Sequence, residues 1–168
     1  GAIRTLDIRI NSDGGDVFDG RTIYSLLNQH PANVTVYVDG LAASIASLIA
    51  MAGNQIVMAD GSMMMIHKAW GVTFGNEDDM RKQADLLAMV DKTLVKTYCD
   101  RTGMDASKCM QMMEDETWMS SADCIKNGFA DKIAEPMKVA AMVHNLVSGE
   151  DGRVIPVADR FKHVPASL

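Results

Sequence analysis

The stretch Gly40-Leu41-Ala42-Ala43-Ser44 opens the longest apolar run of this chain and decides its fold. The run is too short to cross a bilayer, so we expect a buried helix over 44–51, closed by Gly53-Asn54. The segment 34–38 is predicted to be a strand that ends at Asp39-Gly40. A strand that leads into a buried helix is typical of a layered α/β domain.

The chain up to Pro136 continues this alternation of strands and helices. Apolar residues at helical spacing predict amphipathic helices, and short alternating runs predict strands. A long helix over 77–99 has an apolar face and a charged face, and Asp91 is expected on the charged face. The remaining expected elements are strands over 3–10, 55–58, 63–67 and 131–133, a helix over 16–29, a helix capped by Asp105 that ends at Glu114, and a helix capped by Ser121 that ends at Asn127-Gly128.

Composition narrows the classes of function. The chain has 168 residues, of which 48% are hydrophobic, and this is enough apolar material for one domain with a core. Its formal net charge of −6 and the lack of a Lys/Arg stripe argue against nucleic acid as a partner. The three cysteines are too few and too scattered for a disulfide framework or a zinc site. We therefore expect a cytoplasmic protein with reduced thiols, without metal, cofactor or membrane partner.

We expect two parts in the chain. Residues 1–135 should form the folded domain, and residues 136–168 a C-terminal extension with a helix over 138–147. The chain begins at Gly1 without a signal sequence or an initiator methionine. We therefore expect that an N-terminal part of the domain lies upstream of this start.

A serine, a histidine and an acidic cluster follow one another along the chain. Ser44 stands where the buried helix begins, and a helix start offers unpaired N–H groups and a positive dipole end to a developing anion. His67 ends a short apolar run, and Glu114-Asp115-Glu116 follows later. The alternative roles are a helix N-cap for Ser44, a packed structural residue for His67 and a solvated surface for the acids. Geometry alone defines a catalytic triad.

Two neighbouring features bear on the same chemistry. Gly14-Gly15 follows the first strand, and it can form a tight turn or present backbone N–H groups to an oxyanion. Lys68 could replace His67 as the base for Ser44. Because side chains alternate along a strand, however, Lys68 is expected on the opposite face of the sheet.

Four separated motifs together resemble the proteolytic subunit of the Clp proteases. The segment Ile10-Asn11-Ser12-Asp13-Gly14-Gly15 is similar to the family's Ile-Asn-Ser-Pro-Gly-Gly, and 40–44 matches Gly-x-Ala-Ala-Ser. Met65-Ile66-His67 matches Met-Ile-His, and 118–131 is similar to the segment that follows the family's catalytic acid. The likeness runs from about residue 3 to residue 133 and is nearly collinear. It implies a Clp/crotonase-like α/β fold of stacked β-α units with an outlying handle helix.

The resemblance also implies an activity, that of a serine endopeptidase with its protease domain over 1–135. Ser44 would be the nucleophile and His67 the general base. Glu116 would complete the triad, with Asp115 as the rival acid.

Further roles at the site follow from the same resemblance. The oxyanion hole would be formed by the N–H groups of Gly15 and Ile45. An extended peptide would add as a strand along four residues, Asp16, Val17, Lys68 and Ala69. The helix over 77–99 would join two rings, so the expected partners are a protein substrate and further copies of this chain in a homo-oligomeric ring.

The sequence departs from the family pattern at several positions. Glu116 stands where the family has Asp, Asp13 replaces Pro, and Lys68-Ala69 replaces Gln-Pro. These departures, and the tail with Phe161-Lys162-His163-Val164-Pro165, resemble the Clp-like proteases of phages and prophages, which cut scaffold or capsid proteins during head maturation. That branch implies a location in the bacterial cytoplasm or in the phage prohead. The family's axial pore segment is missing ahead of the first strand, which leaves docking to an unfoldase ATPase open.

The sequence is also compatible with two other classes of protein. A crotonase-like acyl-CoA enzyme would bind a thioester oxyanion with backbone N–H groups but without this serine and histidine. A ring-forming structural subunit with a degenerate site stays open because Glu116 replaces the usual Asp.

Overall fold

The computed structural model describes residues 3–135, 146–148 and 154–156. The chain divides into two units, Gly1–Glu135 and Pro136–Leu168. In the second unit, β7 (Leu146–Ser148) and β8 (Val154–Pro156) pair as a small antiparallel sheet. The expected helix over 138–147 is wrong at 146–147, which belong to β7, and its residues 138–145 lie outside the described part of the chain.

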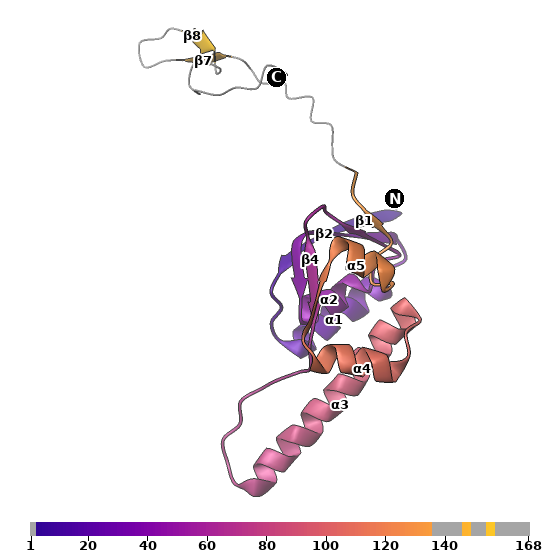
Figure 1. The fold of residues 1–168 in the computed structure, drawn as a ribbon, viewed down its shortest axis with the longest axis vertical. Helices are drawn as coiled ribbons and strands as arrows, with labels where there is room; N and C mark the ends of the chain where they lie inside the picture. Colours follow the sequence, from indigo (N-terminus) through magenta and orange to yellow (C-terminus); the bar gives the residue numbers. More distant parts are fainter. Residues whose placement is uncertain (1–2, 136–145, 149–153, 157–168) are drawn as a thin grey trace. The chain divides into compact units, whose positions relative to one another are not determined.

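The first unit is a six-stranded mixed sheet with helices packed against it, which confirms the predicted α/β class (Figure 1). The strand order is β5-β4-β2-β3-β6, and β1 pairs with β2. The elements in chain order are β1 (Thr5–Ser12), α1 (Val17–Asn28), β2 (Asn33–Ala43), α2 (Ile45–Ala50), β3 (Gln55–Met58), β4 (Met63–Ile66), α3 (Glu77–Thr102), α4 (Ala106–Glu114), β5 (Thr117–Ser120), α5 (Ser121–Lys126) and β6 (Lys132–Ile133).

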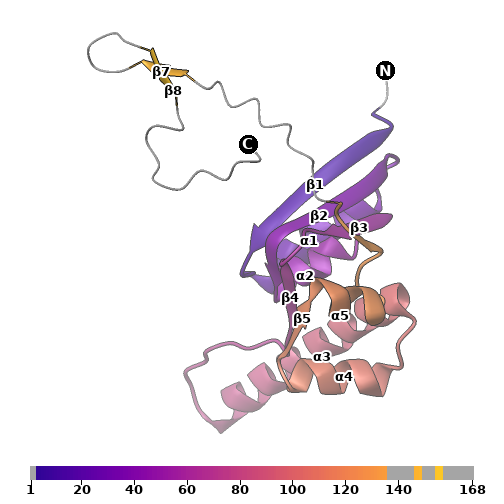
Figure 2. The ribbon, with the colours of Figure 1, turned by 45° about the horizontal axis from the view of Figure 1, so that its top comes forward.

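The sheet is built around β2, which is longer than the sequence predicts. Its first half pairs in parallel with β1 on one side and with β3 on the other, as Figure 2 shows. Its second half continues past Gly40 and pairs in parallel with β4, with Leu41 opposite Met63. The predicted end at Asp39-Gly40 is wrong because the backbone still finds partners there: β4 on one side, and on the other the Asn11 side chain, which accepts a hydrogen bond from the Leu41 N–H at 3.1 Å.

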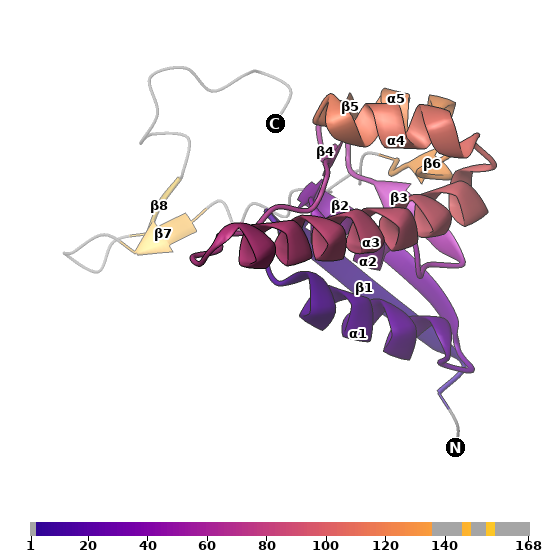
Figure 3. The same ribbon diagram turned by 90° about the horizontal axis from the view of Figure 1, so that it is seen from below.

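The short helix α2 lies at the centre of the core, as its apolar sequence predicts. All of its residues except Ile49 are buried, and it contacts α1, α3 and the strands β1, β2 and β4. In Figure 3, α3 passes in front of α2 and α1 lies beside it. Because α2 is packed on several sides, the position of its first residue, Ile45, is fixed, and so is the end of the turn at Ser44.

The long helix α3 has two halves with different environments. Its first turns project away from the sheet (Figure 1), and Met80 and Met89 are exposed there. Its C-terminal half packs into the core through Val90, Leu94 and Tyr98. The helix runs beyond the predicted residue 99 and ends at Gly103, whose φ of 70° supplies a left-handed cap.

The C-terminal part of the sheet contains a strand that the sequence does not predict. β5 pairs antiparallel with β4, with Trp118 opposite Met65. A four-residue strand carries too little periodicity to be recognised without its partner. The following helix is capped by Ser120 and not by the predicted Ser121, because Ser120 and Asp123 exchange side-chain and backbone hydrogen bonds in a capping box.

The three cysteines of the first unit are free thiols. Cys99, Cys109 and Cys124 are not joined in disulfides. Burial raises the pKa of the Cys109 and Cys124 thiols to about 12, so both stay protonated at neutral pH. Among the helices that the structure describes, none combines the length and the apolar character needed to cross a membrane.

Gly20 on α1 permits the close contact between α1 and α2. A Cβ at this position would lie 2.2 Å from Cγ1 of Ile45. We expect Gly20→Ala to lower the free energy of unfolding by about 1–2 kcal/mol, because overpacking outweighs the better helix propensity of alanine. Urea denaturation followed by circular dichroism measures this. The exposed Ser25→Ala on the same helix is the control, and an unchanged or higher midpoint for Gly20→Ala would contradict the packing argument.

Candidate active site

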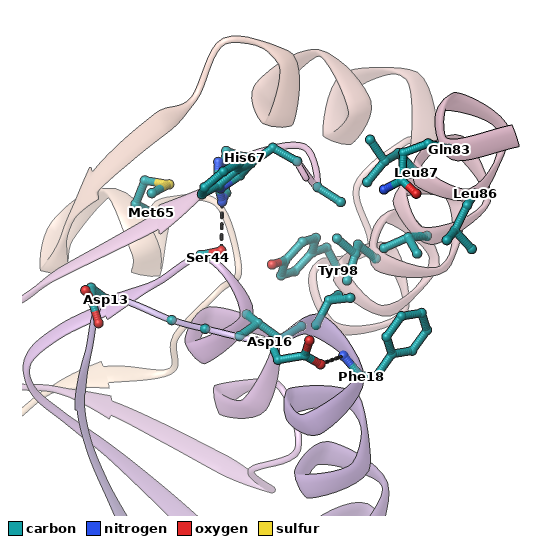
Figure 4. A pocket seen from close by; sticks show the side chains of 18 residues that line it. Asp13, Asp16, Phe18, Ser44, Met65, His67, Gln83, Leu86, Leu87 and Tyr98 are labelled. Carbon is teal, nitrogen blue, oxygen red and sulfur yellow. Dashed lines mark hydrogen bonds between the residues drawn. The ribbon is translucent and has the colours of Figure 1, made fainter. Parts of the chain in front are cut away.

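The structure brings Ser44 and His67 into direct contact. The Ser44 Oγ lies 2.7 Å from the His67 Nε2 (Figure 4). Ser44 directly follows β2 and His67 directly follows β4. Because these strands are parallel neighbours, their C-terminal ends lie at the same edge of the sheet. The two residues are therefore adjacent in space although they are far apart in sequence.

The Ser44 backbone is held in a conformation that few residues adopt. Its φ is 55° and its ψ is −129°, a strained combination for a residue with a Cβ. The Ser44 N–H donates to the Met65 carbonyl at 2.9 Å, which ties the turn to β4. The Ser44 side chain makes no capping hydrogen bond, so the alternative role as an N-cap is not the one seen here. Its hydroxyl instead points to the imidazole.

A hydrogen-bonded chain from α3 supports this strained turn. Ser47 Oγ donates to the Ser44 carbonyl at 2.6 Å, and it lies 2.8 Å from the Tyr98 hydroxyl. Because Ser47 has only one hydroxyl proton, Tyr98 is the donor in the second bond. Burial raises the pKa of Tyr98, which keeps its hydroxyl protonated and able to donate. The chain therefore holds the Ser44 carbonyl from within the core.

The Gly14-Gly15 turn packs directly against Ser44. A Cβ on Gly14 would lie 2.8 Å from the Ser44 Cβ and 3.0 Å from the Ala43 carbonyl oxygen, and the φ of Gly14 is 110°. Only glycine fits such a close approach at this backbone angle. The Gly14 N–H donates to the Ser12 hydroxyl. The N–H of Ile45, the first residue of α2, has no carbonyl partner within the helix.

A cavity of about 520 Å³ opens beside the Ser44 hydroxyl. One wall is formed by the glycine turn and the start of α1, and the opposite wall by apolar side chains of α3, as Figure 4 shows. The predicted site residues among its lining are Ser44, His67, Gly15, Ile45, Asp16, Val17 and Ala69. The side chain of Asp16 also caps α1 by accepting from the N–H groups of Phe18 and Asp19.

Asp115 and Glu116 do not line this cavity, and neither does Lys68. Its amine lies 3.8 Å from a carboxylate oxygen of Asp91 and 3.6 Å from one of Glu114. Its backbone N–H donates to the Met113 carbonyl at 3.1 Å. The lysine thus faces α3 and α4, and the amine is directed to acidic groups and not to Ser44.

The two candidate acids have other partners in this structure. Glu116 Oε1 accepts from the Trp118 indole N–H at 3.2 Å, and Asp115 accepts from the side chain of Gln111 at 2.9 Å. Within residues 3–135, neither carboxylate is hydrogen-bonded to His67. Glu116 has a φ of 49° and forms the turn between α4 and β5. No cluster of at least three His, Cys, Asp or Glu side chains in the described part of the chain could hold a metal ion.

Sequence reasoning missed three polar residues around the site, namely Ser47, Tyr98 and Asp91. The expectation that Asp91 lies on the charged, outward face of α3 is wrong, because this residue is only 1% exposed. The signal was its spacing: Leu87, Asp91, Leu94 and Tyr98 follow one another at intervals of four, three and four, which places them on one helix face. A carboxylate on an apolar face indicates a buried partner.

The contact between Ser44 and His67, and the fold that positions it, indicate the class of protein. On a Clp/crotonase-like α/β fold, a strained serine between a strand and a buried helix lies within hydrogen-bonding distance of a histidine at the next parallel strand, a geometry that can activate a serine hydroxyl. The profile of the Clp protease family matches residues 2–137. The chain belongs to the Clp protease family.

Relatives agree with this assignment. The chain is 30% identical over 135 residues to "ATP-dependent Clp protease proteolytic subunit 2" of Synechococcus sp. (strain CC9605), which covers 79% of this chain and 68% of the relative. It is 30% identical over 132 residues to the "ATP-dependent Clp protease proteolytic subunit" of Deinococcus radiodurans, covering 77% and 65%. The subunit of the same name from Streptococcus agalactiae is 32% identical over 130 residues, covering 75% and 66%. The chain thus spans about two thirds of the length of these relatives.

The hydrogen-bonded chain from Tyr98 to Ser44 makes a stability prediction. We expect Tyr98→Phe to lower the free energy of unfolding by about 1 kcal/mol, because one buried hydrogen bond is lost. Ser47→Ala should cost about 2 kcal/mol, because it leaves the buried Tyr98 hydroxyl without its acceptor and removes one of the two hydrogen bonds that Ser47 gives to the Ser44 carbonyl. Urea titrations of both variants measure the difference. Equal midpoints for the parent and Ser47→Ala would show that the chain contributes nothing to the turn.

Proposed function

We propose that this chain is a serine endopeptidase in which Ser44 attacks the carbonyl carbon of a peptide bond. The observation that carries the proposal is the 2.7 Å contact between the Ser44 Oγ and the His67 Nε2. His67 takes the hydroxyl proton as the new C–O bond forms, and it gives that proton to the leaving amine. Water then releases the acyl-enzyme by the same proton transfers. The names of the relatives, proteolytic subunits of Clp proteases, support this reaction.

The oxyanion of the tetrahedral intermediate would be held by the N–H groups of Gly15 and Ile45. Both residues line the cavity beside Ser44. The N–H of Gly14 is already bonded to Ser12, which leaves its neighbour as the donor from this turn. Each such donor contributes roughly a hundred- to a thousandfold to turnover.

We assign the third triad position to Glu116. The assignment is supported by the antiparallel pairing of β4 and β5, whose last pair is Ile66 with Thr117, because His67 and Glu116 are the residues that directly adjoin this pair. Asp115 lies one residue further from β5, at the C-terminal cap of α4, where its carboxylate accepts from Gln111. The Glu116 carboxylate would leave the exposed Trp118 indole and accept from the His67 Nδ1–H, which fixes the tautomer that Ser44 needs. Such hydrogen bonds are often loose until substrate binds.

The substrate would be an extended polypeptide. It would lie between the segment after Gly15, at Asp16 and Val17, and the segment after His67, at Ala69. The long, partly exposed helix α3 would join copies of the chain in a ring, as the name "proteolytic subunit" of the relatives suggests. Docking of an unfoldase ATPase stays outside this proposal.

The departures at Glu116 and Lys68-Ala69 support a more specific substrate, a phage scaffold or capsid protein, in the bacterial cytoplasm or the prohead. Co-expression of such a protein with the parent chain or with Ser44→Ala tests this. We expect mass spectrometry to detect cleavage products when the phage protein is co-expressed with the parent chain, and none when it is co-expressed with Ser44→Ala. Identical fragments with both chains would contradict the role in capsid maturation.

Ser44→Ala tests the reaction itself. We expect hydrolysis of a fluorogenic peptide to fall to background. The free energy of unfolding should stay within about 0.5 kcal/mol of the parent value. A fluorophosphonate should label the parent at Ser44 and leave the variant unlabelled. A variant that cuts peptide at the parental rate would remove the assignment, and tight binding of CoA by an unlabelled parent would favour the acyl-CoA alternative.

The assignment of the acid is tested by two matched amide variants. We expect Glu116→Gln to lower kcat/KM at least about a hundredfold, because the amide cannot stabilise the imidazolium. Asp115→Asn should stay within about twofold of the parent. Loss of activity in Asp115→Asn alone would move the assignment to that residue, and loss in neither would leave the triad without an acid from this cluster.

A further inference from the structure

Asp91 on α3 is a buried carboxylate that the proposed reaction does not use. It is 1% exposed, and its Oδ1 accepts a hydrogen bond from the Ala69 N–H at 2.8 Å. Its Oδ2 lies 3.8 Å from the Lys68 amine. A carboxylate is costly to remove from water unless hydrogen bonds and an opposite charge compensate it. Both compensating groups here come from one short segment.

That segment begins directly after His67. β4 is held up to Ile66 by its pairing with Thr117 of β5. Beyond the histidine, the Lys68 N–H donates to the Met113 carbonyl of α4 and the Ala69 N–H donates to Asp91 of α3. The backbone on both sides of His67 is therefore fixed, by strand pairing before it and by two helices after it.

The position of the imidazole depends on this support. His67 is only half-buried, and the hydrogen bond shown for its ring is the 2.7 Å contact with Ser44. Within residues 3–135 the ring has no second hydrogen bond, so until Glu116 engages the imidazole its position is set by the backbone of His67. A displacement of about 1 Å between reacting groups can cost about a hundredfold in rate. The residue after Lys68 also forms part of the cavity wall.

We propose that Asp91 is a positioning residue for His67, which acts by holding the Ala69 N–H and with it the backbone that follows the histidine. The inference rests on the proposed function, because it gives Asp91 a part in the reaction of Ser44 and His67. The hydrogen bond to Ala69 carries the effect. The Lys68 amine, shared with Glu114, balances the buried charge.

A purely structural ion pair makes a different prediction. It would change the fraction of folded protein but not the rate of each folded site. The rates are therefore expressed per active site, counted by titration of Ser44 with a fluorophosphonate in the full chain. Two rates are compared, the second-order labelling of Ser44 and kcat with its KM for a short fluorogenic peptide.

Three variants separate the two cases. We expect Asp91→Ala to lower labelling and kcat per site by the same factor, roughly tenfold or more, with KM within about twofold. Asp91→Asn keeps an oxygen that can accept from Ala69, so it should retain at least about a third of both rates. Asp85→Ala, at an exposed aspartate of the same helix, should match the parent.

Ala69→Pro provides an independent test, because proline has no N–H to donate. We expect the same loss as for Asp91→Ala, and no further loss when both changes are combined, since each breaks the same bond. If Asp91→Ala does not fold, Ala69→Pro alone carries the test, and parental rates per site in it would overturn the inference.

Parental rates per site in Asp91→Ala, an equal loss in Asp91→Asn, or multiplied losses in the double variant would each overturn the positioning role. A parent chain that is not labelled at Ser44 would instead overturn the proposed function. A labelled parent with an unaffected Asp91→Ala would leave the proposed function intact.

Discussion

The parallel pairing of β2 with β4 is the constraint on which the site depends. It brings the ends of both strands to one edge of the sheet, with Ala43 opposite Met65 and the Ser44 N–H bonded to the Met65 carbonyl. The chain then turns sharply at Ser44 into the buried helix α2. Because α2 is enclosed by the sheet and two other helices, the turn cannot relax toward an ordinary helix start. The strain at Ser44 is thus maintained by packing, and its hydroxyl is directed to the imidazole.

The second support comes from α3, which contacts the site from the opposite side of the cavity. Its core-facing half carries a tyrosine whose hydroxyl reaches the Ser44 carbonyl through Ser47. One and a half to two turns earlier on the same face, Asp91 holds the backbone after His67. One helix therefore contacts the surroundings of both reacting groups.

The sequence predicted the elements with strong local signals. The run after Gly40 gave the buried helix, Asp105 caps α4 through the Ser107 N–H as expected, and β3 has the predicted bounds. The errors occur where a distant partner decides. β2 continues past Gly40 because β4 pairs with it, and β5 exists because β4 offers an edge. The spacing of Asp91 places it on the apolar face of α3, but the partner that makes a carboxylate tolerable there, the Ala69 N–H, comes from another part of the chain.

The sequence by itself determined the alternation of strands and helices, the glycine turn, a serine at the start of the buried helix and a histidine at the end of a strand, because these follow from local periodicity and backbone preference. Only the tertiary structure decided which of these groups meet. The 2.7 Å contact between Ser44 and His67 and the hydrogen bond from the Ala69 N–H to Asp91 depend on the register and packing of segments far apart in the chain. Register is set by the summed packing and pairing of the whole sheet, and no single stretch of residues encodes it.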